Sequence, residues 1–336
     1  MSAGADILGT ESVSIGELTI SGRALLAPMS GVTDVGMRRV AMRFGASAVI
    51  SEMVASDDYV RGAEESRLRA EGEGVTPHIV QIAGCEPYWM GEAARLAEAS
   101  GAAAVDINMG CPAKRVTGGY AGSALMRDTS LALRLIEATV GAVRIPVTLK
   151  MRLGWDAATL NAPDLARQAQ AAGIKLVTVH GRTRQQFYKG SADWGAIARV
   201  REAITIPLVA NGDCDGPEAA QAMLSASGAD AVMIGRAAVG RPWLVGEIAG
   251  ALAGQAATPI GLAPRKQAAI EHLETLLGCM GAHAGLRHAR KHLSAYAQFA
   301  GAPEDLRLRL VTSDDPRQAK SLLEAAFSEN SLSQAA

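Results

Sequence analysis

Short runs of apolar residues recur at regular intervals along the first two thirds of the chain. Each run is four to eight residues long, which suits a strand that is buried on both faces of a parallel sheet. Most of the runs are followed by an alanine-rich stretch with the 3.6-residue period of an amphipathic helix. The eight expected strands are Leu25–Pro28, Ala46–Met53, His78–Gly84, Ala104–Asn108, Val147–Arg152, Leu176–His180, Pro207–Asn211 and Ala231–Ile234.

The helical stretches carry boundary signals of their own. Pro163 and Pro217 stand where a first helical turn tolerates proline, because the N–H that proline lacks has no partner there. Gly101, Gly173 and Gly228 stand where helices end, a place that favours glycine. The clearest expected helices are Tyr88–Ser100, Ser130–Val143, Ala162–Ala172, Trp194–Ala203 and Pro217–Ala226.

Eight strands alternating with helices predict an α/β fold, namely a (β/α)8 TIM barrel of about 250 residues. A doubly wound sheet would also alternate, but no Gly-x-Gly-x-x-Gly sequence follows the first strand. The alternation stops near residue 243, residues 250–264 are rich in Ala, Gly and Pro, and residues 265–326 show helical patterns alone. We therefore expect a barrel over residues 1–250 and a small all-helical C-terminal domain over residues 251–330.

Polar residues stand at the end of nearly every expected strand. The C-terminal ends of barrel strands converge on one face, which is where barrel enzymes carry their active sites. A barrel with a purely structural role has no use for so many polar groups in register, so the pattern predicts an active site. The residues are Glu52, Gln81, Asp106, Asn108, Lys150, Arg152, His180, Arg182, Asn211, Asp213 and Arg236.

Cys111 follows the fourth expected strand, in a loop that contains Lys114 and Arg115 and three glycines. An ordinary thiol has a pKa near 8.5 and is mostly protonated at neutral pH, which suits a proton donor. Nearby cations could instead depress the pKa and favour a nucleophile. The spacing alone leaves both roles open.

Two further features of the expected active site indicate an anionic ligand. Asn211-Gly212-Asp213 and Gly235-Arg236 follow the last two strands, where barrels often bind phosphate with backbone N–H groups. Lys150 lies inside an apolar run, so its ammonium group should point into the barrel mouth. There it either forms a Schiff base or holds a negative charge such as that of a reduced flavin, whose edge Gln81 could bond.

Composition and charge narrow the possible partners. The formal net charge is −1, so a nucleic-acid site would have to be a local basic patch. The four cysteines lie far apart, which disfavours a disulfide framework or a cysteine zinc site and suits a reducing cytoplasm. We expect no secretory signal and no membrane span. His288 and His292 are four residues apart, but their basic neighbours favour a solvated basic face, so we expect no metal.

These motifs, in this order, resemble the tRNA-dihydrouridine synthases, flavin enzymes that reduce the C5–C6 double bond of uridines in tRNA. The resemblance covers nearly the whole chain, and Lys291-His292-Leu293 is similar to a motif of one bacterial group. The other matching segments are Ala27–Asp34, Ser51–Met53, Val80–Gly84, Asp106–Pro112, Leu149–Arg152, His180–Arg184, Ala210–Asp213 and Ile234–Arg236.

The resemblance implies FMN in the barrel mouth and NADPH, or NADH, as the electron source. Cys111 would give a proton to uracil C5 while reduced flavin gives hydride to C6. The implied cofactor-binding residues are Pro28, Met29, Ser30, Gln81, Lys150, His180, Asn211, Gly212, Asp213, Gly235 and Arg236. The implied substrate-binding residues are Asn108, Arg152, Arg182, Lys114, Arg115, Arg287 and Lys291.

The helical domain would hold the tRNA, with a D-loop uridine as the expected target and a cytoplasmic monomer as the expected form. The family often has an aromatic residue where this chain has Ala295, which leaves Tyr296 as the nearby ring for stacking on a base. Three other functions remain open: a flavin barrel that reduces a small pyrimidine, as dihydroorotate dehydrogenases do, a Schiff-base lyase, and an RNA-binding module with an inactive barrel.

Overall fold

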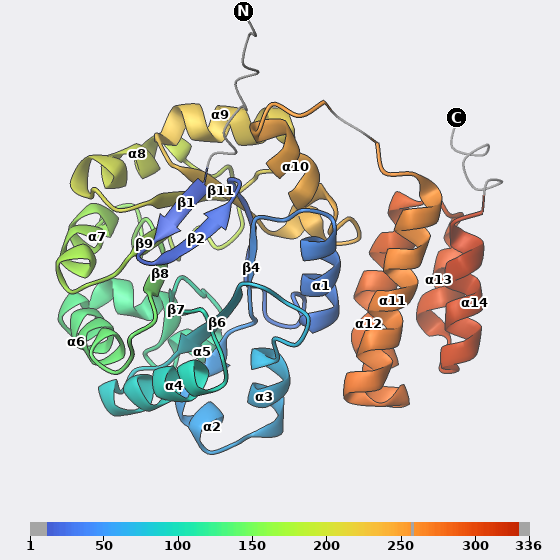
Figure 1. The fold of residues 1–336 in the computed structure, drawn as a ribbon, viewed down its shortest axis with the longest axis horizontal. Coiled ribbons are helices and arrows are strands. Elements are labelled where there is room, and N and C mark those ends of the chain that lie inside the picture. Colours follow the sequence, from blue (N-terminus) through green and yellow to red (C-terminus); the bar gives the residue numbers. More distant parts are fainter. Residues whose placement is uncertain (1–11, 257–258, 329–336) are drawn as a thin grey trace, which may run out of the picture.

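The computed structural model describes residues 12–256 and 259–328. Residues 1–11, 257–258 and 329–330 of the two predicted domains therefore lie outside the described residues. Parallel strands close into an eight-stranded barrel, in which β3 pairs with both β4 and β11 and β4 also pairs with β6 (Figure 1). The second strand is broken into two pieces. The strands are β3 (Ala24–Leu26), β4 (Ala48–Ile50), β5 (Val54–Ala55), β6 (His78–Ala83), β7 (Ala104–Met109), β8 (Val147–Arg152), β9 (Leu176–His180), β10 (Leu208–Asn211) and β11 (Ala231–Ile234).

Helices surround the barrel and cover its outer face. All five helices that the sequence predicts are present, with their ends shifted by at most three residues. Short helices in the loops add to them: α5 (Lys114–Thr117), η1 (Gly122–Arg127) and η2 (Arg236–Ala238). The outer helices are α1 (Val35–Arg43), α2 (Ser56–Val60), α3 (Glu64–Ala70), α4 (Pro87–Ala99), α6 (Thr129–Val140), α7 (Ala162–Ala171), α8 (Trp194–Ala203), α9 (Pro217–Ser227) and α10 (Leu244–Leu252).

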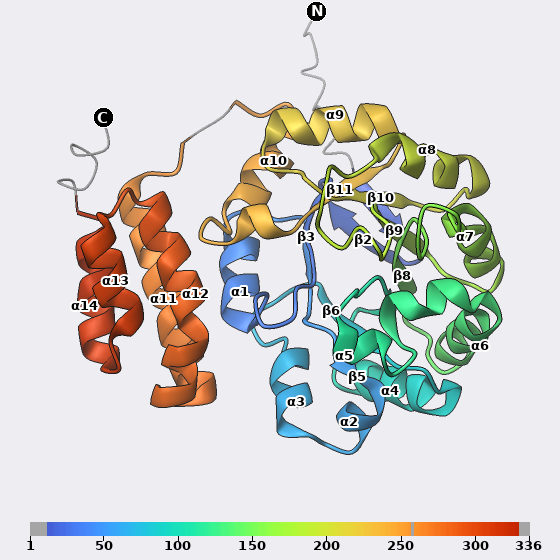
Figure 2. The ribbon, with the colours of Figure 1, turned by 180° about the vertical axis from the view of Figure 1, so that it is seen from behind.

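A hairpin before the first barrel strand covers the end at which the strands begin. It consists of β1 (Ser12–Ile15) and β2 (Leu18–Ser21), an antiparallel pair seen across the barrel in Figure 1. Val13, Ile15 and Ile20 are buried and pack in one cluster with the first residues of the barrel strands. The hairpin therefore closes one end of the barrel, and the opposite end, seen in Figure 2, is left for a site.

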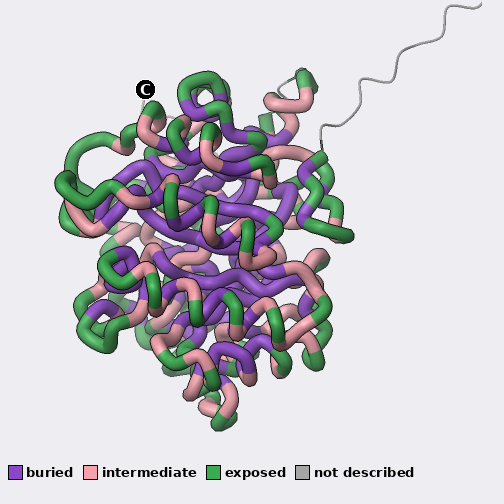
Figure 3. Tube along the Cα trace, turned by 90° about the vertical axis from the view of Figure 1, so that its left-hand side faces the viewer, coloured by how far each residue is buried: buried purple, intermediate pink, exposed green. Residues whose placement is uncertain are grey.

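Burial follows this arrangement. The buried backbone lies in the strands and on the inner faces of the helices, whereas the exposed segments lie at the periphery (Figure 3). In the part of the chain that the structure describes, no helix is both long and apolar enough to cross a membrane.

Four further helices form a bundle beside the barrel, and their hydrophobic core also includes Val40 of α1 and Trp243. They are α11 (Leu262–Met280), α12 (Ala282–Phe299), α13 (Glu304–Thr312) and α14 (Pro316–Ala326). The bundle meets the barrel where α11 packs against α1 (Figure 1).

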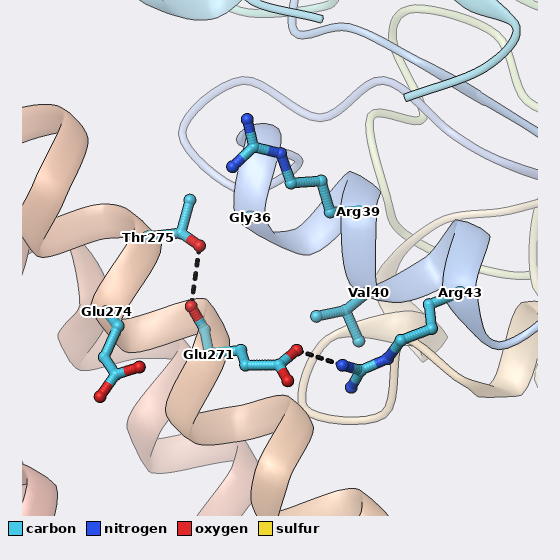
Figure 4. Close-up of a pocket in the computed structure, with 7 residues that line it drawn as sticks. All are labelled: Gly36, Arg39, Val40, Arg43, Glu271, Glu274 and Thr275. Carbon is cyan, nitrogen blue, oxygen red and sulfur yellow. Dashed lines mark hydrogen bonds and ion pairs between the residues drawn. The ribbon is translucent and has the colours of Figure 1, made fainter. Parts of the chain in front are cut away.

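The contact between α1 and α11 is close. Arg43 of α1 forms an ion pair with Glu271 of α11 at the edge of a small pocket (Figure 4). A Cβ atom at Gly36 would lie 2.8 Å from the ring of His272, so glycine permits the approach of the two helices at this point. The bundle is thus held to the barrel through α1.

Candidate functional site

A cavity of about 730 Å³ opens at the barrel end opposite the hairpin. Its size lies within the range of about 300–1,000 Å³ that is typical of small-molecule and cofactor sites. The convergence of strand ends that the polar pattern predicts is therefore present. Fourteen of the residues predicted from the sequence line it: Pro28, Met29, Ser30, Gln81, Asn108, Cys111, Lys150, Arg152, His180, Asn211, Gly212, Asp213, Gly235 and Arg236.

Three polar side chains on β6 and β7 form a chain of hydrogen bonds in the cavity wall. Gln81 donates to Asp106 Oδ2 at 2.6 Å and accepts from Asn108 Nδ2 at 2.8 Å. The other carboxyl oxygen of Asp106 accepts from Thr148 at 2.6 Å. Burial raises the pKa of Asp106 above its ordinary value. Each partner fixes the next, so the Gln81 amide is held in a single orientation with one N–H still available for a ligand.

The same chain reaches the Cys111 loop. Asn108 Oδ1 accepts hydrogen bonds from the backbone N–H of Cys111 at 3.0 Å and of Gly110 at 3.2 Å. Burial raises the pKa of the Cys111 thiol, an effect that Arg152 and Lys150 only partly oppose. The thiol is therefore protonated at neutral pH and lies in the wall of the cavity. A protonated thiol in the cavity wall is compatible with the proton-donor role, one of the two that the sequence leaves open.

Lys150 brings a positive charge to the cavity. Its ammonium group donates to Asn211 Oδ1 at 2.9 Å, and Asn211 in turn donates to the backbone of β11 at 2.8 Å. Burial, with a contribution from Arg152, lowers the pKa of Lys150 to about 8, so most of the lysine is still charged at pH 7. Burial and nearby cations also hold the pKa of His180 well below its ordinary value, so its imidazole is neutral.

Arg152 joins two loops at the rim. It donates to the carbonyl oxygen of Gly110 at 2.7 Å and to those of Thr183 and Phe187 at 3.0 Å each. Although burial lowers the pKa of Arg152 to about 10, the side chain stays cationic at neutral pH. Arg152 therefore sets the position of the backbone beside Cys111.

Arg182 lies behind the cavity wall instead of lining it. Only 2% of its side chain is exposed, and its guanidinium group forms a bidentate ion pair with Asp213 at 2.6 and 2.9 Å. Burial would raise the pKa of Asp213, but the bonds from Arg182 and Ala192 outweigh it and leave the pKa below its ordinary value. Arg236 lies 3.2 Å from the same carboxylate on its exposed side. Arg182 thus anchors Asp213, and Asp213 orients Arg236.

The remaining predicted substrate-binding residues lie outside the cavity. Lys114 and Arg115 are exposed on α5, in the loop that follows Cys111. Arg287 and Lys291 are exposed on α12 and line a second pocket between the bundle and the barrel. The structure therefore distributes these four cations over two parts of the surface.

Two aromatic residues at the cavity rim were not predicted. Phe187 and Tyr188 are 42% and 44% exposed, line the cavity, and pack edge to face with ring centroids 4.7 Å apart. The guanidinium carbon of Arg236 lies 4.9 Å from the centroid of the Tyr188 ring. Two consecutive aromatic residues are unusual in a chain with only 4% aromatic residues, so the sequence did contain a signal for this pair. They offer an apolar surface on which a flat ring can stack.

The stacking role expected of Tyr296 is wrong. Tyr296 is 1% exposed, its hydroxyl group lies 2.9 Å from His272 Nδ1, and its ring stacks on Trp243. The prediction that His292 lies on a solvated basic face is also wrong, since this residue is only 2% exposed. The helical period of α12 does place Tyr296 on one face with Leu286, Ala289 and Leu293, so this part of the sequence already contained a signal for its burial.

Comparisons with known proteins agree with this site. The family model described as dihydrouridine synthase matches residues 25–332. A protein of Rhizobium leguminosarum bv. phaseoli named "Probable tRNA-dihydrouridine synthase" is 52% identical over 94% of this chain and 98% of its own length. The "tRNA-dihydrouridine synthase B" of Xanthomonas axonopodis pv. citri is 47% identical over 90% of this chain and 92% of its own.

Among solved structures, more distant barrel proteins share only the fold with this chain. An old yellow enzyme homologue from Zymomonas mobilis superposes with a TM-score of 0.51 at 16% identity, over 70% of this chain and 90% of that one. The match to the family model extends over the cavity residues and the helical bundle alike. The chain belongs to the dihydrouridine synthase family.

Proposed function

We propose that this protein is a tRNA-dihydrouridine synthase, which uses FMN and NAD(P)H to reduce the C5–C6 double bond of uridine in tRNA. The observation that carries the proposal is the cavity itself. A protonated thiol, a buried ammonium group and a fixed amide converge in it from separate strands of a barrel of this family. A D-loop uridine is the proposed target, and the cytoplasm is the proposed place, because both tRNA and NAD(P)H are available there.

The residues of the cavity suit FMN. Gly235 leaves its backbone open beside Met29 and Ala27, which a Cβ atom would contact at 3.6 and 3.8 Å, and Arg236 follows it with its guanidinium group at the exposed edge. Backbone N–H groups and an arginine in this position can hold a phosphate. Lys150 and the remaining N–H of Gln81 are placed to contact an electron-rich ring edge. Neutral His180 completes this side of the site.

The chain's own residues account for the proton that the reaction needs. When bound, FMN reduced by NAD(P)H supplies the hydride for uracil C6. Cys111 holds the proton for C5 on Sγ, and the resulting thiolate regains a proton from water. Asn108 Oδ1 accepts a hydrogen bond from the backbone N–H of Cys111, and Arg152 donates one to the carbonyl oxygen of Gly110. These two bonds fix the backbone around the thiol. The cationic Lys150 and Arg152 stabilise the thiolate while it exists.

Binding of tRNA is proposed to involve both exposed basic groups. Lys114 and Arg115 lie beside the Cys111 loop, and Arg287 and Lys291 lie on the bundle formed by the proposed domain of residues 251–330. Phosphate contacts from Lys and Arg dominate the affinity for nucleic acids. The aromatic rim of Phe187 and Tyr188 would receive a base that has left the stack.

The test is a position-by-position map of dihydrouridine in tRNA from a strain that lacks this protein. Complementation with the wild-type gene should restore dihydrouridine at defined positions, and Cys111→Ala should not. An unchanged map in a strain without a second synthase would reject the proposal. In that case dihydroorotate-type activity on a small pyrimidine, assayed with the same protein, would become the leading alternative.

A further inference from the structure

A cluster of three histidines surrounds one buried carboxylate where the bundle meets the barrel. Asp34 lies directly before α1, His272 lies on α11, and His288 and His292 lie on α12. Asp34 and His292 are 4% and 2% exposed. The cluster is separate from the cavity at the barrel mouth and has no part in the reaction proposed above.

Two of these histidines lack a hydrogen-bond partner for a buried ring nitrogen. Nε2 of His288 and Nε2 of His292 are both buried and unpaired within the described residues. Both atoms face the same oxygen, Asp34 Oδ2, at 3.7 and 3.3 Å respectively. Both contacts have ion-pair distances but fall short of hydrogen-bond geometry, so neither buried nitrogen is fully satisfied by the carboxylate, and a ligand shared by both nitrogens and the oxygen would satisfy all three.

The third histidine is fully paired and supports the carboxylate. His272 Nε2 lies 3.0 Å from Asp34 Oδ1, and His272 Nδ1 lies 2.9 Å from the Tyr296 hydroxyl. Asp34 Oδ1 also accepts the N–H of Met37 as the cap of α1. His272 Nε2 also lies 3.2 Å from Oδ2, so both oxygens contact His272, and Oδ2 is the one that in addition faces His288 and His292. Outer-shell bonds of this kind orient the ligands of a metal ion.

We propose that Asp34, His288 and His292 form a binding site for one divalent transition metal ion, with zinc as the ion that fits best. The three ligand atoms all lie within 4.8 Å of one another. Two imidazoles and a carboxylate form a donor set typical of zinc sites that keep a fourth position open. His288 and His292 present their rings on one face of α12, because they are four residues apart.

The donor set favours zinc, and two of the three ligand separations can be compared with those of a tetrahedral ion. Zinc–ligand bonds of about 2.0–2.1 Å place tetrahedral ligands about 3.3–3.4 Å apart. Octahedral bonds of similar length would require ligand separations of about 3.0 Å. The distances from Asp34 Oδ2 to the two nitrogens, 3.3 and 3.7 Å, lie at and somewhat above the tetrahedral value.

An entry path and a fourth position are available. Asp34 and His288 line the pocket of about 810 Å³ between the bundle and the barrel, together with Glu52 and Lys291. The Lys291 ammonium group is bonded to the carbonyl oxygen of His288 at 2.9 Å, which keeps it off the proposed ligand atoms. A bound ion would join the start of α1 to α12 and so tie the bundle to the barrel. The sequence did not indicate this site, because no carboxylate with metal-ligand spacing lies near His288 and His292 along the chain. Asp34 reaches them only through the packing of the helices.

The experiment measures zinc in untagged, flavin-loaded protein after passage over a chelating resin, and then titrates Zn²⁺ by calorimetry. Wild type should bind a single zinc ion per chain, and His288→Ala should weaken binding at least 100-fold. His288 lies at the pocket and its side chain is 21% exposed, so this variant should fold. His283→Ala, an exposed position on the same helix, is the matched control and should bind zinc as wild type does.

Two further measurements keep the result unambiguous. A chelator should lower the melting temperature of wild type but not that of His288→Ala, since an ion bound only to the folded state stabilises it. Cys279→Ser removes an exposed thiol from the same pocket and should leave zinc binding unchanged. No zinc binding by wild type, or binding that is equal in His288→Ala or lost only in Cys279→Ser, would overturn the proposal.

Discussion

Gln81 donates a 2.6 Å hydrogen bond to the buried carboxyl group of Asp106. The two residues face each other in the register of β6 and β7, so the bond is built into the strand pairing. Through Asn108 the same chain reaches the backbone of Cys111. Asp106 does not line the cavity, but through these bonds it positions Gln81 and Asn108, which do.

Asp106→Ala should weaken FMN binding about ten-fold. The substitution leaves the Gln81 amide without its acceptor, and an unsatisfied buried group costs about 1–3 kcal/mol. Asp106→Asn is the matched control, because asparagine can accept from Gln81 while donating to Thr148. Fluorescence titration of FMN into the apoprotein measures both. Equal losses in the two variants would mean that the hydrogen bond to Gln81 is not what matters.

Lys150→Met should lower the two-electron reduction potential of the bound flavin by about 30–60 mV. A hydrogen bond to a charged group contributes about 1.5–3 kcal/mol, and 30 mV corresponds to about 1.4 kcal/mol for two electrons. Because the pKa of Lys150 is lowered only to about 8, the effect should be present at pH 7 and should fade above pH 8 as wild type loses its own charge. A potential that does not differ between the proteins at pH 7 would contradict this role.

The rate of dihydrouridine formation should stay high past the ordinary thiol pKa of about 8.5. Burial raises the pKa of Cys111, and a proton donor is active below its pKa, so activity should be lost only as the pH rises through that higher value. The profile is measured with pre-reduced enzyme and saturating tRNA, so that the earlier flavin reduction does not enter. Lys150 also titrates near pH 8, so the same profile is measured in Lys150→Met; loss of activity between pH 7 and 8 in that variant too would show that the thiol pKa is not raised.

Binding of tRNA should weaken steeply with salt, and the slope should report the proposed basic contacts. Each phosphate contact removed should reduce the slope of log affinity against log salt by about one. Lys114→Ala and Arg287→Ala should each do so, without a change in flavin content. Arg167→Ala, on the outer surface at α7, is the control and should leave the slope as it is. A wild-type affinity that is insensitive to salt would reject the electrostatic model of tRNA binding.

The strands were predicted well because burial on both faces gives each one a continuous apolar run. The intervals Val147–Arg152, Leu176–His180 and Ala231–Ile234 agree with the structure to the residue. The second expected strand, Ala46–Met53, contains only β4 (Ala48–Ile50), and β5 (Val54–Ala55) begins directly after its predicted end. The hairpin of Ser12–Ser21 was missed, although its alternation of polar and apolar residues around Gly16 is a recognisable signal.

The site was predictable in its residues but not in its contacts. Strand ends place Arg182 near the cavity, yet the direction of its side chain depends on Asp213, which lies 31 residues later. Asp34 and His292 are separated by most of the chain and meet only because α12 packs on α11, which in turn packs on α1. Such pairings depend on tertiary packing, which a local pattern does not contain. The roles assigned to the cavity residues remain predictions.

The most direct test of the central claim follows the reduced flavin under anaerobic conditions after mixing with unmodified tRNA. Cys111→Ala should be reduced by NAD(P)H at the wild-type rate, since the thiol is not needed for that step. Its reoxidation by tRNA should be slower by about 10²–10⁴-fold, the usual contribution of a positioned general acid. Equal reoxidation rates in wild type and variant would contradict the assignment of Cys111 as the proton donor.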